Sequence, residues 1–86
     1  MSVSLDHELE QLDRLLAVLA ASPEREAHLV EEHAQFARAY LLGAMPGEYE
    51  ANLAMAQDAA GQIPDQAMRE KVLSIVEAVI SSHQAR

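Results

Sequence analysis

The sequence predicts an all-α fold of about four short amphipathic helices, and three observations support this prediction. Apolar residues recur three or four positions apart along most of the 86 residues, which is the spacing of one helix face. Alanine is abundant and there are only three glycines, which favours helix over sheet. Breaks rich in glycine or proline interrupt the pattern. We therefore expect one domain over residues 1–86, with antiparallel hairpins forming a small bundle from helices at about 4–21, 23–42, 46–60 and 65–82.

The first predicted helix carries a seam of leucines. They recur alternately four and three residues apart, as in a heptad pattern, at Leu5, Leu9, Leu12, Leu16 and Leu19. Leu15 and Val18 widen the apolar arc beyond a single stripe. Asp6 and Glu8 stand in the first turn, where the helix dipole favours negative charge. This arc is wider than an ordinary amphipathic helix requires.

The second predicted helix opens at Ser22 and Pro23. Serine can cap free amide groups and proline fits the first helical position. The core stripe consists mostly of small residues, which would let another helix approach closely: Ala27, Val30, Ala34, Ala37 and Leu41. A set of larger side chains runs alongside this stripe: Leu29, His33, Phe36 and Tyr40.

Two further breaks define the third and fourth helices. Gly43 followed by Pro46 stops the second helix and opens the third. The third helix is the least hydrophobic, with its stripe at Tyr49, Leu53, Ala56 and Ala60. Asp65, or the residue before Pro64, is expected to cap the fourth helix, and residues 81–86 are expected to fray. The fourth stripe is the most apolar and is expected to form the centre of the core: Met68, Val72, Ile75 and Val79.

Charge and composition narrow the function classes. The formal net charge is −8, and residues 1–62 carry all of it. Such a surface repels phosphate, so we expect neither nucleic acid nor an anionic membrane as a partner. The chain has no cysteine, its uncharged stretches are too short to span a membrane, and its first residues lack a signal-peptide pattern. These features predict a cytoplasmic protein.

The clearest candidate for a metal or small-ligand site is a cluster on the second helix. Glu24 lies one turn before His28, and Glu31 and Glu32 lie one turn after it. A carboxylate-bridged dimetal bundle needs glutamate three residues before histidine on two helices, and no histidine here has that neighbour. We therefore expect His28 to be a solvated surface residue and His33 to be a packing residue. A metal- or ligand-binding bundle remains the alternative function, although we expect no cofactor.

Catalytic motifs are missing from the sequence. It has no cysteine nucleophile, and the three glycines form no phosphate-binding loop. The third and fourth helices could be interpreted as helix-turn-helix, but the overall acidity argues against DNA binding. The sequence therefore predicts a protein without enzymatic activity.

The leucine seam leaves two interpretations open. It can face the intramolecular core, or its excess can bury against a second copy or a partner helix. We predict a small acidic helical protein-interaction module that forms a homodimer or binds a helical partner. The partner-binding residues would be Leu5, Leu9, Leu12, Leu16 and Leu19.

The segment from Gly43 to Tyr49 resembles the turn of the small needle co-chaperones of type III secretion. In those helical hairpins a glycine-containing turn leads into a helix with an early tyrosine, and the resemblance covers about 40 residues from Leu12 to Tyr49. It implies a co-chaperone for a helical client, as a further alternative. The break at 61–64 and the fourth helix depart from that family's pattern.

Overall fold

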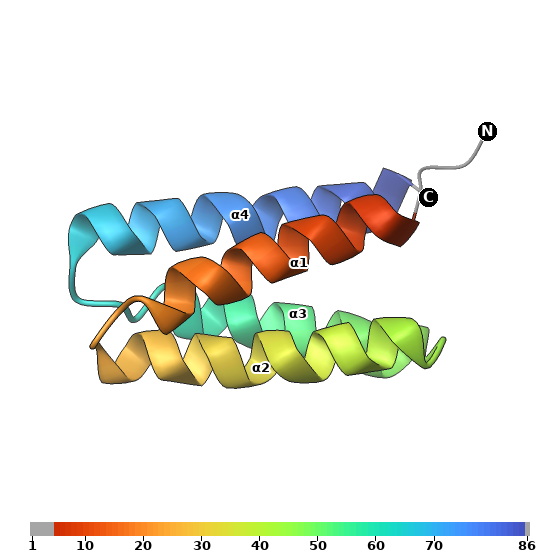
Figure 1. Ribbon diagram of the computed structural model, residues 1–86, viewed down its shortest axis with the longest axis horizontal. Coiled ribbons are helices and arrows are strands. Elements are labelled where there is room, and N and C mark those ends of the chain that lie inside the picture. The colour runs from red at the N-terminus through yellow and green to blue at the C-terminus, as the bar shows by residue number, and fades with distance from the viewer. Residues whose placement is uncertain (1–4, 86) are drawn as a thin grey trace.

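The computed structural model describes residues 5–85, and these fold into four α-helices with no strand among them (Figure 1). The bundle measures 38 × 20 × 18 Å. Each helix packs on its neighbours in the chain, and α1 also packs on α4, which closes an antiparallel ring. The predicted all-α bundle is therefore confirmed. The helices are α1 (Leu5–Ala20), α2 (Arg25–Leu42), α3 (Pro46–Ala60) and α4 (Gln66–Ala85).

The helix ends agree with the predictions except at two places. The predicted start at residue 4 lies outside the described residues. Helix α2 begins at Arg25 rather than Pro23, because the Ser22 hydroxyl accepts the Glu24 N–H at 3.2 Å and holds a turn before the helix. Helix α4 continues to Ala85, so the expected fraying of residues 81–85 is wrong.

Two of the predicted helix starts are confirmed by their local contacts. An Asp65 carboxylate oxygen accepts the N–H of Met68 at 2.8 Å, which is the bond that an N-cap makes. Pro46 occupies the first turn of α3, where its missing N–H costs nothing.

The turn between α2 and α3 contains a backbone conformation that the sequence did not indicate. Ala44 has a φ of 56°, in the left-handed region, whereas Gly43 before it has a φ of −83°. Left-handed geometry costs an L-residue roughly 1–2 kcal/mol. The turn is held by backbone bonds from Gly43 N–H to the Ala39 carbonyl at 2.9 Å and from Met45 N–H to the Tyr40 carbonyl at 3.0 Å.

The buried stripes of the four helices meet in two clusters of side chains. The buried residues of α2 and α3 are the ones expected, and alanine is the commonest type among them. Small side chains let two helices pack closely, and α2 and α3 form the most extensive helix pair of the bundle. The buried residues of these two helices are Ala27, Val30, Ala34, Ala37, Leu41, Tyr49, Leu53, Ala56 and Ala60.

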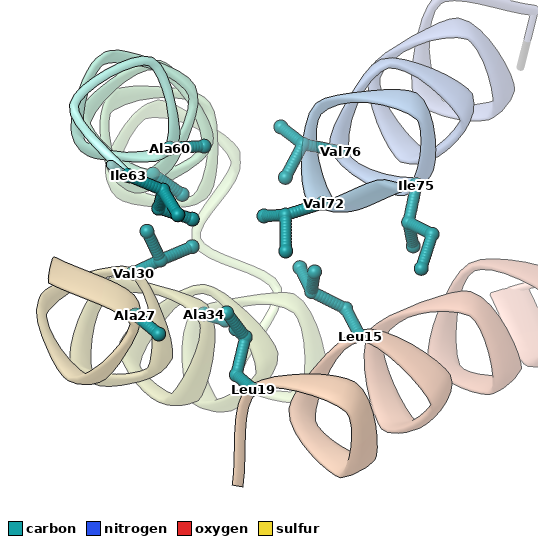
Figure 2. Close-up of a cluster of buried hydrophobic side chains, with 11 residues drawn as sticks. Leu15, Leu19, Ala27, Val30, Ala34, Ala60, Ile63, Val72, Ile75 and Val76 are labelled. Atoms are coloured by element: carbon teal, nitrogen blue, oxygen red, sulfur yellow. The ribbon is translucent and has the colours of Figure 1, made fainter. Parts of the chain in front are cut away.

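The larger apolar cluster fills the half of the bundle where α1 joins α2 and α3 joins α4 (Figure 2). Leu15 of α1, Val76 of α4 and Val30 of α2 all point into the space that the four helices enclose. Ile63, in the loop before α4, is fully buried with them. The full set is Leu15, Leu19, Ala27, Val30, Ala34, Ala56, Ala60, Ile63, Val72, Ile75 and Val76, called the apolar cluster below.

The opposite end of the bundle has a layer of different chemistry. This end holds the start of α1, the α2–α3 turn and the end of α4, at the right of Figure 1. Its layer consists of Glu8, Leu41, Tyr49 and His83, called the end layer below. A smaller cluster lies directly beneath it, with Leu12, Ala37, Leu53 and Val79.

Candidate functional site

The structure divides the predicted leucine seam of α1 between core and surface. The buried residues of α1 are Glu8, Leu12, Leu15 and Leu19, so the core stripe is offset from the predicted seam. Leu12 and Leu19 are fully buried within the bundle, Leu9 and Leu16 are half-buried, and Leu5 is exposed. Contact with a partner therefore stays a prediction, and in this bundle only Leu5, Leu9 and Leu16 offer surface for it.

Large exposed apolar side chains concentrate on the α2–α3 hairpin rather than on α1. Among the described residues, the only such side chain outside the hairpin is Leu5 of α1. The members on the hairpin are each 43–55% exposed: Leu29, Phe36, Leu42, Met45 and Met55. We call this set the hairpin surface.

Three members of the hairpin surface, Leu29, Phe36 and Met55, lie along one face of the helix pair, whereas Leu42 lies about 120° around α2 from Phe36. Leu29 and Phe36 are two turns apart and therefore share a face of α2. Half-buried Tyr40 continues this row towards the turn. Because α3 runs antiparallel to α2, Met55 lies near the level of Phe36. Leu29, Phe36 and Met55 therefore form an exposed row, and Tyr40 at its end also packs against the smaller cluster.

The hairpin that carries this row is acidic. Helices α2 and α3 contain six acidic residues and only two basic ones, Arg25 and Arg38. The Arg38 guanidinium donates to an Asp13 carboxylate oxygen of α1 at 2.7 Å, so one of the two positive charges is already paired. The acidic residues are Glu26, Glu31, Glu32, Glu48, Glu50 and Asp58.

Glu8 is a fully buried glutamate in the end layer. The Tyr49 hydroxyl of α3 donates a hydrogen bond to a Glu8 carboxylate oxygen at 2.8 Å. Both side chains occupy core stripes of their helices, which is why residues so distant in sequence meet. The sequence analysis assigned Glu8 to the first turn as a charge that the helix dipole favours, and missed this role. The available signal was the spacing of Glu8 from Leu12, Leu15 and Leu19, which places it on the core stripe.

His83 joins Glu8 to the surface. Its Nε2 lies 2.8 Å from an oxygen of Glu50, and its Nδ1 lies 3.8 Å from an oxygen of Glu8. Because an ionised carboxylate only accepts, the Nε2–H donates to Glu50. The imidazole also meets the Tyr49 ring edge-on, with centroids 4.9 Å apart. The sequence reasoning missed His83 because it assigned this segment to a frayed tail.

A cavity of about 360 Å³ opens beside the end layer, and all four helices contribute to its wall. Its lining is mostly apolar with two tyrosines and one histidine: Leu5, Tyr40, Leu41, Ala44, Met45, Pro46, Tyr49 and His83. We call it the end cavity. A second cavity of similar volume shares His83 and is lined also by Glu50, Leu53, Ala54, Gln57, Ile80 and Gln84. Among the described residues, neither lining includes a lysine or an arginine.

The histidine and glutamates of α2 do not converge as a metal site. His28 Nδ1 lies 3.2 Å from a Glu31 carboxylate oxygen in an exposed pair, while Glu24 precedes the helix. Among residues 5–85, no group of three or more histidine, aspartate or glutamate side chains is placed to hold a metal ion. His33 is half-buried, as expected of a packing residue.

Comparison with known proteins does not extend these observations. No family model matches the chain, and neither the curated proteins nor the solved structures contain a match. Helix α4 is present, so the chain departs from the co-chaperone pattern where the sequence indicated. Within the described residues, each helix is too short or too polar to cross a membrane.

Proposed function

We propose that this chain is a non-enzymatic interaction module whose α2–α3 hairpin binds a basic amphipathic helix of a partner protein. The observation that carries the proposal is the concentration of exposed large apolar side chains on the acidic hairpin. Helix-binding surfaces of proteins combine a row of apolar anchors with flanking charge. The hairpin has both features.

The apolar row provides the anchors. Phe36 is half exposed although it is the only phenylalanine in the chain. Aromatic residues and methionine are enriched at the centre of protein interfaces, where they supply large contact areas. Phe36 and Met55 fit such a centre, and Leu29 lies further along the row at its end.

The negative charge of the hairpin bears on whether its partner is a second copy of this chain or a different protein. Two copies meeting through this hairpin would bring two acidic surfaces together, and like charges facing each other oppose association. A helix with lysine or arginine beside its apolar face would instead meet complementary charge. This favours a basic partner over a homodimer through the hairpin surface.

A titration with a defined probe tests the proposal. The probe is a synthetic amphipathic helix of leucine and lysine, added to ¹⁵N-labelled protein and followed by amide chemical shifts. We expect the largest shifts near Leu29, Phe36 and Met55, and affinity that falls as salt is added. A peptide of the same composition in scrambled order should bind at least tenfold more weakly. Equal binding of the two peptides, or shifts scattered over α1 and α4, would overturn the proposal.

Matched serine variants locate the surface. The double variant Leu29→Ser, Phe36→Ser should weaken peptide binding roughly tenfold or more. The control Leu5→Ser also replaces an exposed leucine but should leave binding unchanged. Equal loss in the control would indicate the α1 seam instead. Sedimentation of the wild type as a dimer that the double variant dissociates would assign the surface to a second copy and contradict our proposal.

A further inference from the structure

We propose that Glu32 and Asp58 determine which helix the hairpin surface binds: one with a lysine or arginine on each side of its apolar face. The proposal rests on the proposed function of the hairpin and adds the positions of the charges that a partner must match. Three features support it: the place of the exposed apolar row, the position of the two carboxylates on its outer edges, and their unpaired charge.

The exposed apolar row lies over the junction between α2 and α3. The Arg38 guanidinium pairs with α1, and Leu29 is about 180° around α2 from Arg38, so Leu29 lies on the side away from α1. Glu50 bonds to α4, and Met55 is about 140° around α3 from Glu50, so Met55 lies on the side away from α4. Because the four helices contact one another in a ring, these are the sides on which α2 and α3 adjoin.

Glu32 and Asp58 lie on the two outer edges of this row, and both residues are exposed. Glu32 is about 60° around α2 from Leu29, and Asp58 is about 60° around α3 from Met55, in each case away from the junction. Each acidic residue stands two positions from a buried residue on either side of it, which directs its side chain away from the core. These buried residues are Val30 and Ala34 on α2 and Ala56 and Ala60 on α3.

The two carboxylates stand at nearly the same level of the hairpin. Glu32 lies about 15 Å from the end of α2 at the turn, and Asp58 lies about 18 Å from the start of α3 at the same turn. A helix that lies along the apolar row therefore passes between them. Side chains roughly two or five positions apart project from opposite flanks of a helix at similar levels. A partner with basic residues at such a spacing, on either side of its apolar face, would meet both carboxylates.

Both negative charges are available to a partner. Within residues 5–85, neither the Glu32 nor the Asp58 carboxylate has an ion-pair partner, whereas Glu31 next to Glu32 is paired with His28. Arg25 lies about 10 Å along α2 from Glu32. This separation exceeds the screening length of about 8 Å at physiological ionic strength. Charges at the rim of an interface contribute more to the choice and orientation of a partner than to affinity, which is the role we assign to these two residues.

The test compares two synthetic helices of the same composition and the same leucine face. The edge peptide has its lysines on both sides of the leucine face, and the back peptide has them opposite to it, with glutamine at the exchanged positions. Binding to the full chain is followed by the amide shifts of Leu29, Phe36 and Met55. We expect the edge peptide to bind at least fivefold more tightly, by a margin that shrinks as salt is added. Equal binding of the two peptides at these residues would overturn the inference and leave the proposed function intact, whereas binding of neither would overturn both.

Variants that remove one charge at a time assign the effect to the two carboxylates. Glu32→Gln and Asp58→Asn should each weaken binding of the edge peptide about threefold and leave binding of the back peptide unchanged. Glu77→Gln, which removes an exposed glutamate of α4, is the matched control for the change in net charge and should alter neither affinity. An equal effect of the control would show that total charge, rather than Glu32 and Asp58, attracts the peptide.

A reversal of charge separates local recognition from net charge. The double variant Glu32→Lys, Asp58→Lys should bind a peptide with glutamates at both edges at least tenfold more tightly than it binds the edge peptide. The control Glu10→Lys, Glu77→Lys has the same net charge but changes exposed residues of α1 and α4, and should still prefer the edge peptide. A reversed preference in both double variants, or in neither, would contradict the assignment.

Discussion

The two ends of this bundle are built on the same helical stripes but have different chemistry. At one end, the apolar cluster closes the core with aliphatic side chains. At the other, the same stripes end in Glu8, Tyr49 and His83, and a cavity remains beside them. The difference teaches that one pattern of helical stripes can specify both a stabilising core and a polar site, depending on which residues occupy the terminal turns of the helices.

The apolar end contributes stability through burial and close packing. Its side chains gain free energy in proportion to the apolar area removed from water, about 25 cal/mol per Å². The polar end depends on hydrogen bonds instead. The net contribution of each bond to stability is much smaller than its strength in an apolar medium, because folding also breaks bonds to water. Substitutions that exchange these two kinds of environment should therefore have very different effects.

The largest effect is expected from Leu15→Glu, which places at the apolar end the residue type that the other end buries. No tyrosine faces this position in the apolar cluster, so the carboxylate would lack the partner that Glu8 has. We expect a loss of about 4 kcal/mol or more in the free energy of unfolding, measured by urea denaturation at neutral pH. Leu15→Met, which conserves volume, should cost less than about 1.5 kcal/mol. A similar small loss in both variants would show that the two ends do not differ as described.

An intermediate effect is expected from Tyr49→Phe. It removes the hydroxyl that donates to Glu8 and leaves the buried carboxylate without that bond. The expected loss is about 2 kcal/mol in the free energy of unfolding. Tyr40→Phe, in the wall of the same cavity but only half-buried, is the control and should change stability by less than about 0.5 kcal/mol. Identical values for the two variants would mean that the bond to Glu8 contributes nothing.

The smallest effect is expected from the double variant Glu8→Leu, Tyr49→Phe, which makes the end layer resemble the apolar end. Both members of the buried hydrogen bond are removed together, so neither is left unsatisfied. We expect the free energy of unfolding to stay near the wild-type value or to rise by about 1 kcal/mol, by the same denaturation measurement. A double variant less stable than Tyr49→Phe alone would instead show that the Glu8 carboxylate stabilises the fold.

Much of the fold could be predicted because helix periodicity and breaks are local properties of the chain. The stripes of α2 and α3 were predicted in full, and α3 begins and ends where Pro46 and Gly61 indicated. The stripe of α1 was harder, because Leu12 and Leu19 belong to both the predicted seam and the true core stripe. Elsewhere the seam and the core stripe differ by one position, with Leu9 and Leu16 in the seam next to Glu8 and Leu15 in the core stripe. Because Glu8 is charged, the core stripe looks less apolar than the seam.

The candidate sites were harder to predict because they depend on distant contacts. Buried Glu8 meets Tyr49 from another helix, and hydropathy at residue 8 carries no trace of that partner. His83 lay in a segment expected to fray, but its contacts with Glu50 and Tyr49 hold the end of α4 in place. The exposed row on α2 was partly visible in the sequence, since Phe36 and Tyr40 were placed beside the core stripe rather than on it.

The buried glutamate also bears on how the helices align with one another. Leucines repeat along α1, so a slide by one heptad would still place apolar side chains towards the neighbouring helices. Such a slide would move Glu8 to the level that Leu15 occupies, inside the apolar cluster and away from the Tyr49 hydroxyl. The displaced arrangement would thus bury a charge without its donor. One costly side chain at the end of the bundle therefore disfavours a register that leucines alone would permit.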